Sequence, residues 1–548
     1  MDRNSLAYAE ADYIDVPRSH WEPTHTHKTT FNAGDLVPLY FDEDIMPGLT
    51  LGMKTSFVIR MQTPIYPTMD NLVFDYWWFR APKYWYWEHF KEQMGQNSLG
   101  AWSQTIEYTT PQINVTTAYG VNDLASYMGV PIGVTGFKWD RLGINFYCGL
   151  WNNWFRSQVL QAPIVYDTTD STLTSDGTIL TGYGLLPLCK THDYFTSGLI
   201  EPTRNLPGMT NGVTLPLGTS APVVYGQNAG DGANSTASIL GNQAMLRITA
   251  GGAPSLNNVN MSTGAYTSNG NDSNGYLTTD LTNATAASLN ALYLATATQR
   301  LLYLDAEYGT IYRDILRGYG VTASSQDTMI EEYLGGQRVP INIETVLQNS
   351  ETTNASPLGN TGAFSVTANV NEDFVKSFTT HDMLICVGGV RILQHTYQQG
   401  LARQFSRLRR LDHYHPALSH IANQPVYERE IYLQADSVVN SDGLPVNDEV
   451  FNYKEAWQEY MYKPNRISGE LLSTYAQSLD AWHYGDDYSS APVFDDDWII
   501  EDKTLIDRTL AVQSSEAHQF VADFYFEESR TAPIPMHRIP GLLGFTHM

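Results

Sequence analysis

The sequence contains little cysteine and no cysteine motif. Its three cysteines, Cys148, Cys189 and Cys386, are far apart among 548 residues and form no C-x-x-C pair. This scarcity excludes a disulfide framework and a cysteine-based zinc site. We expect three buried free thiols, which suit a reducing cytoplasm.

Positive charge is also scarce. The chain has 32 Lys and Arg against 58 Asp and Glu, a formal net charge of −26. Free-standing nucleic-acid-binding proteins are usually basic, because they gain affinity by displacing counterions from phosphates. The composition therefore disfavours such a protein and also a surface that binds acidic lipids. Any DNA contact would need a local basic patch or a separate basic partner.

Long hydrophobic runs and enzyme motifs are missing. Residues 1–17 contain no apolar signal-peptide segment, and the apolar run 383–390 is too short to span a bilayer. There is no G-x-S-x-G, Walker loop, H-E-x-x-H or Rossmann glycine pattern. We therefore expect no membrane insertion, no enzymatic activity and no cofactor.

What the chain does contain is a set of dispersed strand patterns. Apolar residues alternate with polar ones in 49–61, which predicts a strand with one buried face. Residues 72–82 are aromatic on both faces, so we expect this strand to be covered on both sides. Further strands are predicted at 144–148, 383–393, 426–433 and 519–526. Widely spaced strands joined by long connections predict a mainly β fold, a β-sandwich with long loops.

Helices are predicted to be few. Residues 286–306 have a helical composition, and 306–320 place apolar residues on one helical face that stops at Gly318 and Gly320. Shorter helices are predicted at 85–95 and 150–158.

Residues 205–285 have a distinct composition. These 81 residues carry four charges, Asp231, Arg247, Asp272 and Asp280, among many Gly, Asn, Ser and Thr. Such a composition could indicate a flexible linker. Because Leu, Val, Tyr and Met recur at short intervals, we favour a folded, turn-rich surface excursion.

An arginine-rich segment is the main candidate site. Arg403, Arg407, Arg409 and Arg410, together with Arg391, make a positive island in an acidic chain. They could contact DNA phosphates, or they could pair with acids of the same or a neighbouring subunit. Ion pairing is favoured because acids are plentiful.

Two possible metal sites are disfavoured. Asp412, His413, His415 and His420 follow the arginines, but Pro416 interrupts regular structure and no convergent ligand set is evident. The acidic run 494–498 could bind calcium, yet it lacks EF-hand spacing. We interpret the histidines as packing residues and the acids as a solvated loop, so no metal is expected.

Several longer phrases resemble one known family. They are HTHKTTFNAGDLVPLYFDEDIMPG (25–48), TPIYPTMDNLVFDYWWFRAP (63–82), EYLGGQRVPIN (332–342), KSFTTHDMLICVGGVR (376–391) and TYQQGLARQFSRLRRLDHYHPALSHIANQPV (396–426). In this order and spacing the chain resembles the major capsid protein of microviruses, small single-stranded DNA bacteriophages, and most closely the gokushovirus branch. The resemblance covers 20–548, with 205–285 divergent. Relatives tend to have aromatic residues where this chain has His413 and His415, which supports their packing role.

The resemblance implies a viral jelly roll with long inserted loops. Residues 1–24 would form an N-terminal arm, 25–204 the first part of the core, 205–285 a protrusion at the three-fold axes, and 286–548 a helical pair with the rest of the core. Sixty copies would build a T=1 icosahedral shell around a circular single-stranded DNA genome.

The resemblance also implies partners. The protein would bind itself through pentamer and three-fold contacts, a small basic DNA-binding protein, an internal scaffolding protein and a pilot protein. Packaged DNA would be bound mostly indirectly, and 205–285 would contact a host surface receptor. The protein would reside in the virion after assembly in the host bacterial cytoplasm. Two alternatives stay open: a phage adhesin or spike, and a carbohydrate-binding jelly-roll protein.

Overall fold

The computed structural model describes most of the chain. The described residues are 17–97, 107–174, 184–202, 289–309, 311–350, 352, 357–359, 361–421 and 423–535, together with the backbone of four short strands between 223 and 279. The chain divides into two units. The first comprises Met1–Pro202 and Gly309–Met548, and the second Thr203–Tyr308.

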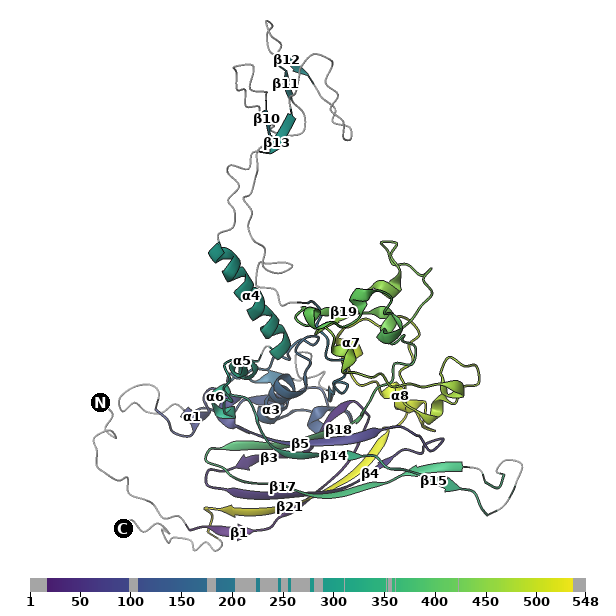
Figure 1. Cartoon of the computed structure of the whole chain (residues 1–548). Helices are drawn as coiled ribbons and strands as arrows, with labels where there is room; N and C mark the ends of the chain where they lie inside the picture. The colour runs from purple at the N-terminus through teal and green to yellow at the C-terminus, as the bar shows by residue number, and fades with distance from the viewer. Residues whose placement is uncertain are drawn as a thin grey trace. The chain divides into compact units, whose positions relative to one another are not determined.

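A β-sandwich forms the centre of the first unit, as the sequence predicts (Figure 1). One sheet has the order β2-β21-β4-β17, with β1 also paired to β21, and the other has the order β14-β5-β18-β3-β9. The chain changes sheet at every step between the eight long strands except from β5 to β14, which is the interleaving of a jelly roll. The bounds of these eight are β2 Thr24–Phe31, β3 Asp35–Ile45, β4 Thr50–Met61, β5 Leu72–Pro82, β14 Glu332–Pro340, β17 Thr367–Ser377, β18 Asp382–Ile392 and β21 Phe520–Ala532. The two short strands are β1 Ser19–Trp21 and β9 Leu186–Pro187.

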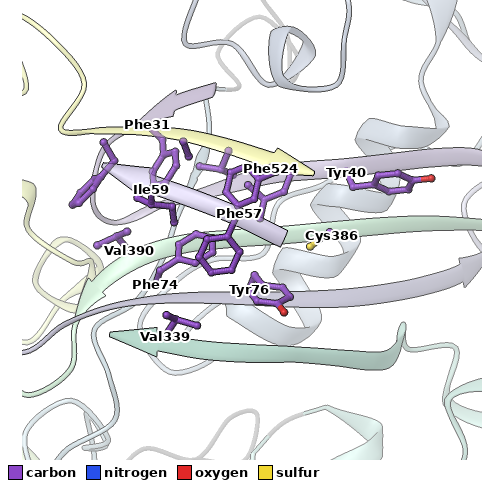
Figure 2. Close-up of a cluster of buried hydrophobic side chains, with 14 of the residues drawn as sticks. Phe31, Tyr40, Phe57, Ile59, Phe74, Tyr76, Val339, Cys386, Val390 and Phe524 are labelled. Atoms are coloured by element: carbon purple, nitrogen blue, oxygen red, sulfur yellow. The ribbon is translucent and has the colours of Figure 1, made fainter. Parts of the chain in front are cut away.

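The main core lies between these two sheets. In β4 the alternate residues point inward and are buried, whereas Val58 and Arg60 face outward. Figure 2 shows Phe57 of β4 beside Phe74 of β5 and Phe524 of β21. The ring centroid of Phe57 lies 5.2 Å from that of Phe74 and 5.8 Å from that of Phe524. Aromatic packing therefore joins the two sheets and adds to the energy gained from burial.

The sheet containing β5 and β18 is covered on both faces. Ten of the eleven residues of β5 are buried, which confirms the prediction for 72–82. Helix α3 (Leu142–Leu150) packs into a second hydrophobic cluster, separate from the main core, together with residues of β5 and β18. The predicted strand at 144–148 is therefore wrong. All nine residues of α3 are buried, so no polar face reveals the helical period, and a short apolar run cannot be told from a strand.

Other expectations are confirmed or corrected by the backbone. The strands expected at 383–393 and 519–526 are β18 and β21, and the helix expected at 286–306 is α4 (Leu289–Tyr308). The helix expected at 306–320 is interrupted at Gly309, whose φ is +102°, so only α5 (Tyr312–Gly318) forms. The strand expected at 426–433 ends early, because β19 (Gln424–Tyr427) runs into the 3₁₀ turn Glu428–Glu430.

Two long connections carry most of the remaining elements. The connection from β5 to β14 contains, in chain order, α1 Phe90–Gln93, β6 Gln112–Val115, α2 Leu124–Tyr127, β7 Phe137–Asp140, α3, the π-helical turn Trp151–Phe155, β8 Leu173–Thr174, β9, the second unit, α5 and α6 Ser325–Thr328. The π-helical turn covers part of the short helix expected at 150–158. The connection from β18 to β21 contains β19, β20 Val450–Lys454, α7 Asp496–Ile499 and α8 Lys503–Asp507. A hairpin of β15 (Ile343–Leu347) and β16 (Thr361–Ser365) joins β14 to β17.

The described part of the second unit contains two small two-stranded antiparallel sheets and α4. Strand β10 (Val223–Gly226) pairs with β13 (Tyr276–Thr279), and β11 (Met245–Arg247) pairs with β12 (Ser255–Asn257). The low-charge segment 205–285 belongs to this unit, and apart from these strands it lies outside the described residues. Helix α4, which the sequence grouped with the C-terminal part, also belongs to it.

Two further features concern cysteine and the membrane. All three cysteines are free; Cys148 and Cys386 are buried as expected, but Cys189 is only partly buried. Within the described residues, no helix is both long and apolar enough to cross a bilayer.

Candidate functional site

The arginine-rich segment lies in the connection between β18 and β21. It consists of 3₁₀ turns at Arg403–Phe405, Arg410–Asp412 and Pro416–Leu418. Tyr414 holds this segment to the 3₁₀ turn Gln458–Tyr460, because its backbone N–H donates to the Tyr460 hydroxyl at 3.0 Å. The four candidate arginines are therefore placed by irregular backbone and side-chain contacts.

Arg403 and Arg407 are directed into the protein. Arg403 Nη1 donates to the carbonyl of Pro425 at 2.8 Å and lies 3.3 Å from a carboxylate oxygen of Glu430. Both arginines approach Glu459, at 3.7 Å and 3.6 Å. The Arg407 guanidinium also lies 3.9 Å from the ring centroid of Tyr460. These two arginines balance acids of their own chain and hold the segment in place.

Arg409 and Arg410 face solvent. The Arg409 side chain is 84% exposed and makes a long ion pair of 3.5 Å with Asp412, while Arg410 is exposed. Asp412 fixes the conformation of the backbone at this turn. Its Oδ2 accepts the N–H groups of Leu408 at 3.1 Å and Arg409 at 2.7 Å, and the Arg409 N–H bond lowers the pKa of the Asp412 carboxyl. The four candidates thus divide into an inward pair and an outward pair.

Arg391 does not belong to this island. It lies on β18, on the face of the sheet that is turned away from the main core, where its Nη2 is 2.7 Å from Oδ2 of Asp75. The same carboxylate receives two bonds from Arg338 of β14, at 2.7 and 2.9 Å. The sequence analysis grouped Arg391 with the island because it is close along the chain. In the structure Arg391 belongs to β18, whereas the other four arginines lie in the connection that follows this strand.

The histidines and the acidic run have local backbone contacts. His415 accepts the N–H of Ala417 at 3.1 Å and so caps the turn Pro416–Leu418. His413 and His420 are exposed. Asp495 accepts the N–H of Trp498 at 2.9 Å and caps α7. Within the described part of the chain, no group of three or more His, Cys, Asp or Glu could hold a metal ion.

Two features of this region are not evident from the sequence. The first is the exposure of apolar residues beside the outward arginines: Leu408 is 87% exposed and Leu411 is 72% exposed. The second is a buried charged cluster, in which His395 lies between Asp486, at 3.0 Å, and Glu501, at 3.2 Å. Neither has a periodic signal, because the exposure follows from the shape of an irregular turn and the charged cluster from segments that are far apart in the sequence.

The chain is similar to known proteins over almost its whole length. A family model described as capsid protein (F protein) matches residues 11–542. The chain is 31% identical to capsid protein VP1 of Bdellovibrio phage phiMH2K, over 99% of this chain and 98% of that protein. It is 30% identical to capsid protein VP1 of Chlamydia phage 1, over 98% and 97% of the two chains, and 31% identical to that of Spiroplasma virus 4, over 96% of each.

These matches and the β-sandwich define a viral capsid protein. The chain belongs to the capsid protein (F protein) family of microviruses, and its relatives are of the gokushovirus type. Membership of this family implies self-assembly into a capsid and a place in the virion.

Proposed function

We propose that sixty copies of this capsid protein close a T=1 icosahedral shell around a circular single-stranded DNA genome. The observation that carries this proposal is the extent of the family match, because residues 11–542 include the sandwich and both long connections. A closed shell needs only moderate strength in each contact, since many contacts act together.

The charge of the chain supports a separate basic partner. Sixty copies at −26 each carry about −1,560 before counterions bind, and DNA is also a polyanion. A small basic DNA-binding protein would neutralise this repulsion, so the shell would contact the packaged DNA mostly indirectly. We include an internal scaffolding protein and a pilot protein as further partners of assembly in the host cytoplasm.

The segment 205–285 would project at the three-fold axes and contact a receptor on the host surface. Its low charge and its place in a unit apart from the sandwich support this role. An insertion of this kind can carry binding function while the scaffold keeps the shell geometry.

Co-expression with the basic and scaffolding proteins tests the proposal. Sedimentation should give particles whose protein mass is sixty times 61.3 kDa, about 3.7 MDa. Deletion of 205–285 should leave the particles closed but abolish attachment to host cells. Only monomers in the presence of both partners would contradict the proposal, and a stable trimer would favour an adhesin.

A further inference from the structure

The outward side of the arginine-rich segment is apolar as well as basic. Leu408 and Leu411 flank Arg409 and Arg410, and we name these four residues the Leu408–Leu411 turn. Among the leucines that the structure describes, Leu408 is the most exposed and Leu411 the next. Removing such side chains from water is favourable, so two of them on one turn favour a protein contact.

The turn is held in one conformation. The carboxylate of Asp412 accepts two backbone N–H groups from it. On its N-terminal side Arg407 is fixed by Glu459 and the ring of Tyr460, and on its C-terminal side Tyr414 bonds to the Tyr460 hydroxyl. A surface that is already ordered loses little conformational entropy on binding.

More apolar surface lies on the neighbouring segments. Met461, which follows Tyr460 in the chain, is 91% exposed, and Phe405 is 60% exposed. Phe, Met and Arg are residue types enriched in protein interfaces, and all three are exposed here. A single-stranded DNA site is instead a basic groove with aromatic stacking platforms. The protruding turn has leucines where such a site would have aromatic rings.

The charge of the chain indicates the partner. Arg410 has no ion pair among the described residues, and Arg409 has only the long one to Asp412. The same chain is acidic, and residues 480–528 contain thirteen Asp or Glu against Lys503 and Arg508. Not all of these acids are on the surface, since Asp486 and Glu501 are buried beside His395. The exposed ones include Asp496 and Asp497, and Val493, close to them in sequence, is 68% exposed.

We propose that the Leu408–Leu411 turn docks on an acidic and apolar surface of a second copy of this chain. The inference rests on the proposed shell, and it assigns one of the subunit contacts within it. Arg403 and Arg407 support the turn from inside, while Leu408, Arg409, Arg410 and Leu411 make the contact.

Two double variants of the full chain test this contact, each co-expressed with the basic and scaffolding proteins. They are Leu408→Asp with Leu411→Asp, and Arg409→Glu with Arg410→Glu. The matched controls are Leu408→Met with Leu411→Met, and Arg409→Lys with Arg410→Lys. All four sites are exposed, so the soluble subunits should unfold at nearly the same temperature as wild type. The yield of particles from the Asp and Glu variants should fall at least about tenfold, which corresponds to a loss of about 1.4 kcal/mol in contact free energy. The controls should assemble with the wild-type yield.

Normal particle yield from the Asp and Glu variants would overturn the inference. Normal yield with less nuclease-protected DNA per particle would also overturn it and assign the arginines to DNA. A photo-reactive phenylalanine derivative in place of Leu411 gives an independent result. Its crosslink should capture a peptide of a second copy, and capture of DNA or of another protein would contradict the contact. Failure of wild type to form shells would refute the proposed function, whereas the crosslink would still decide the inference.

Discussion

Arg391 of β18 and Asp75 of β5 form an ion pair on the face of their sheet that is turned away from the main core, with 2.7 Å between Nη2 and Oδ2. Asp75 is 2% exposed, and Arg338 of β14 binds the same carboxylate through two nitrogens. One carboxylate thus joins three neighbouring strands of one sheet. Charge-assisted bonds of this geometry are strong, but loss of the acid would leave the mostly buried cation of Arg391 without its partner.

Replacing Asp75 by Ala should therefore destabilise the subunit strongly. We expect a loss of about 3–5 kcal/mol in the free energy of unfolding, because Arg391 would stay buried without its partner. Chemical denaturation of the soluble subunit measures this. Arg338→Ala is the matched control and should cost less, since the Arg338 side chain is 47% exposed and Asp75 keeps Arg391. Equal, small losses for both variants would contradict this role.

His395 should make stability fall at alkaline pH. Burial lowers the pKa of His395, but the charges of Glu501 and Asp486 outweigh it and raise the pKa from 6.5 to about 10. A raised histidine pKa stabilises the folded state fully below pH 6.5, and the stabilisation is lost as the pH rises to about 10. Wild type should therefore lose stability between pH 7 and 10, and His395→Gln should lose much less over this range.

Denaturation at pH 6, 8 and 10 checks this profile. His420→Gln serves as the control, because His420 is exposed. Parallel profiles for wild type and His395→Gln would show that the ion pairs of His395 do not control the pH dependence of stability.

Glu428 should weaken the fold at neutral and alkaline pH. Burial, assisted by the charge of Glu449, raises the pKa of Glu428 to about 7. Its Oε1 has no hydrogen-bond partner within the described structure. A carboxyl pKa above the ordinary 4.5 contributes stability below pH 4.5 that is lost as the pH rises through 7. Glu428→Gln should thus raise the free energy of unfolding at pH 8 by about 2–3 kcal/mol and have little effect at pH 4. Glu516→Gln, which removes an exposed charge, should change stability little at either pH.

Two strand glycines should respond differently to alanine. A Cβ on Gly336 of β14 would lie 2.2 Å from the carbonyl oxygen of Tyr76 and 3.0 Å from Cα of Trp77. Because both atoms are backbone of the paired strand β5, the clash cannot be relieved by a rotamer change, and Gly336→Ala should cost about 2 kcal/mol or more. On Gly362 of β16 the nearest atom would be 4.0 Å away, so Gly362→Ala should be tolerated. Comparable soluble yield and stability for the two variants would refute the packing argument.

The isolated protein should bind single-stranded DNA weakly at physiological salt. The net charge of −26 opposes binding, and two of the four candidate arginines are occupied by Glu430 and Glu459. Fluorescence titration with an oligonucleotide at several salt concentrations measures this. Addition of the basic partner should restore binding, whereas tight binding by the chain alone, with a steep salt dependence, would require a direct DNA site.

Sequence reasoning succeeds here where burial imposes a period. The alternation in 49–61 predicts β4 because one face of that strand is in the core, and the two-sided apolar pattern of 72–82 predicts the covered strand β5. It fails for 144–148, because α3 is buried on every side and therefore shows no face. The jelly-roll order itself follows from family resemblance, since pairing between β5 and β14 across a long connection has no local signal.

The candidate site shows the same limit. The sequence identifies Arg403, Arg407, Arg409 and Arg410 as a group. It does not reveal that the first two form ion pairs with Glu459. Asp412 fixes the backbone at Arg409 locally, whereas Arg407 is directed by the ring of Tyr460, which belongs to another loop. Exposure of Leu408 and Leu411 likewise follows from the shape of a turn and not from a sequence pattern.

Cryo-electron microscopy of the protein, co-expressed with its basic and scaffolding partners, tests the central claim most directly. We expect closed particles with icosahedral symmetry in which one β-sandwich fits each of sixty equivalent positions. A protrusion built from 205–285 should rise at each three-fold axis. Well-folded subunits that stay monomeric or trimeric with both partners present would contradict a shell-forming role.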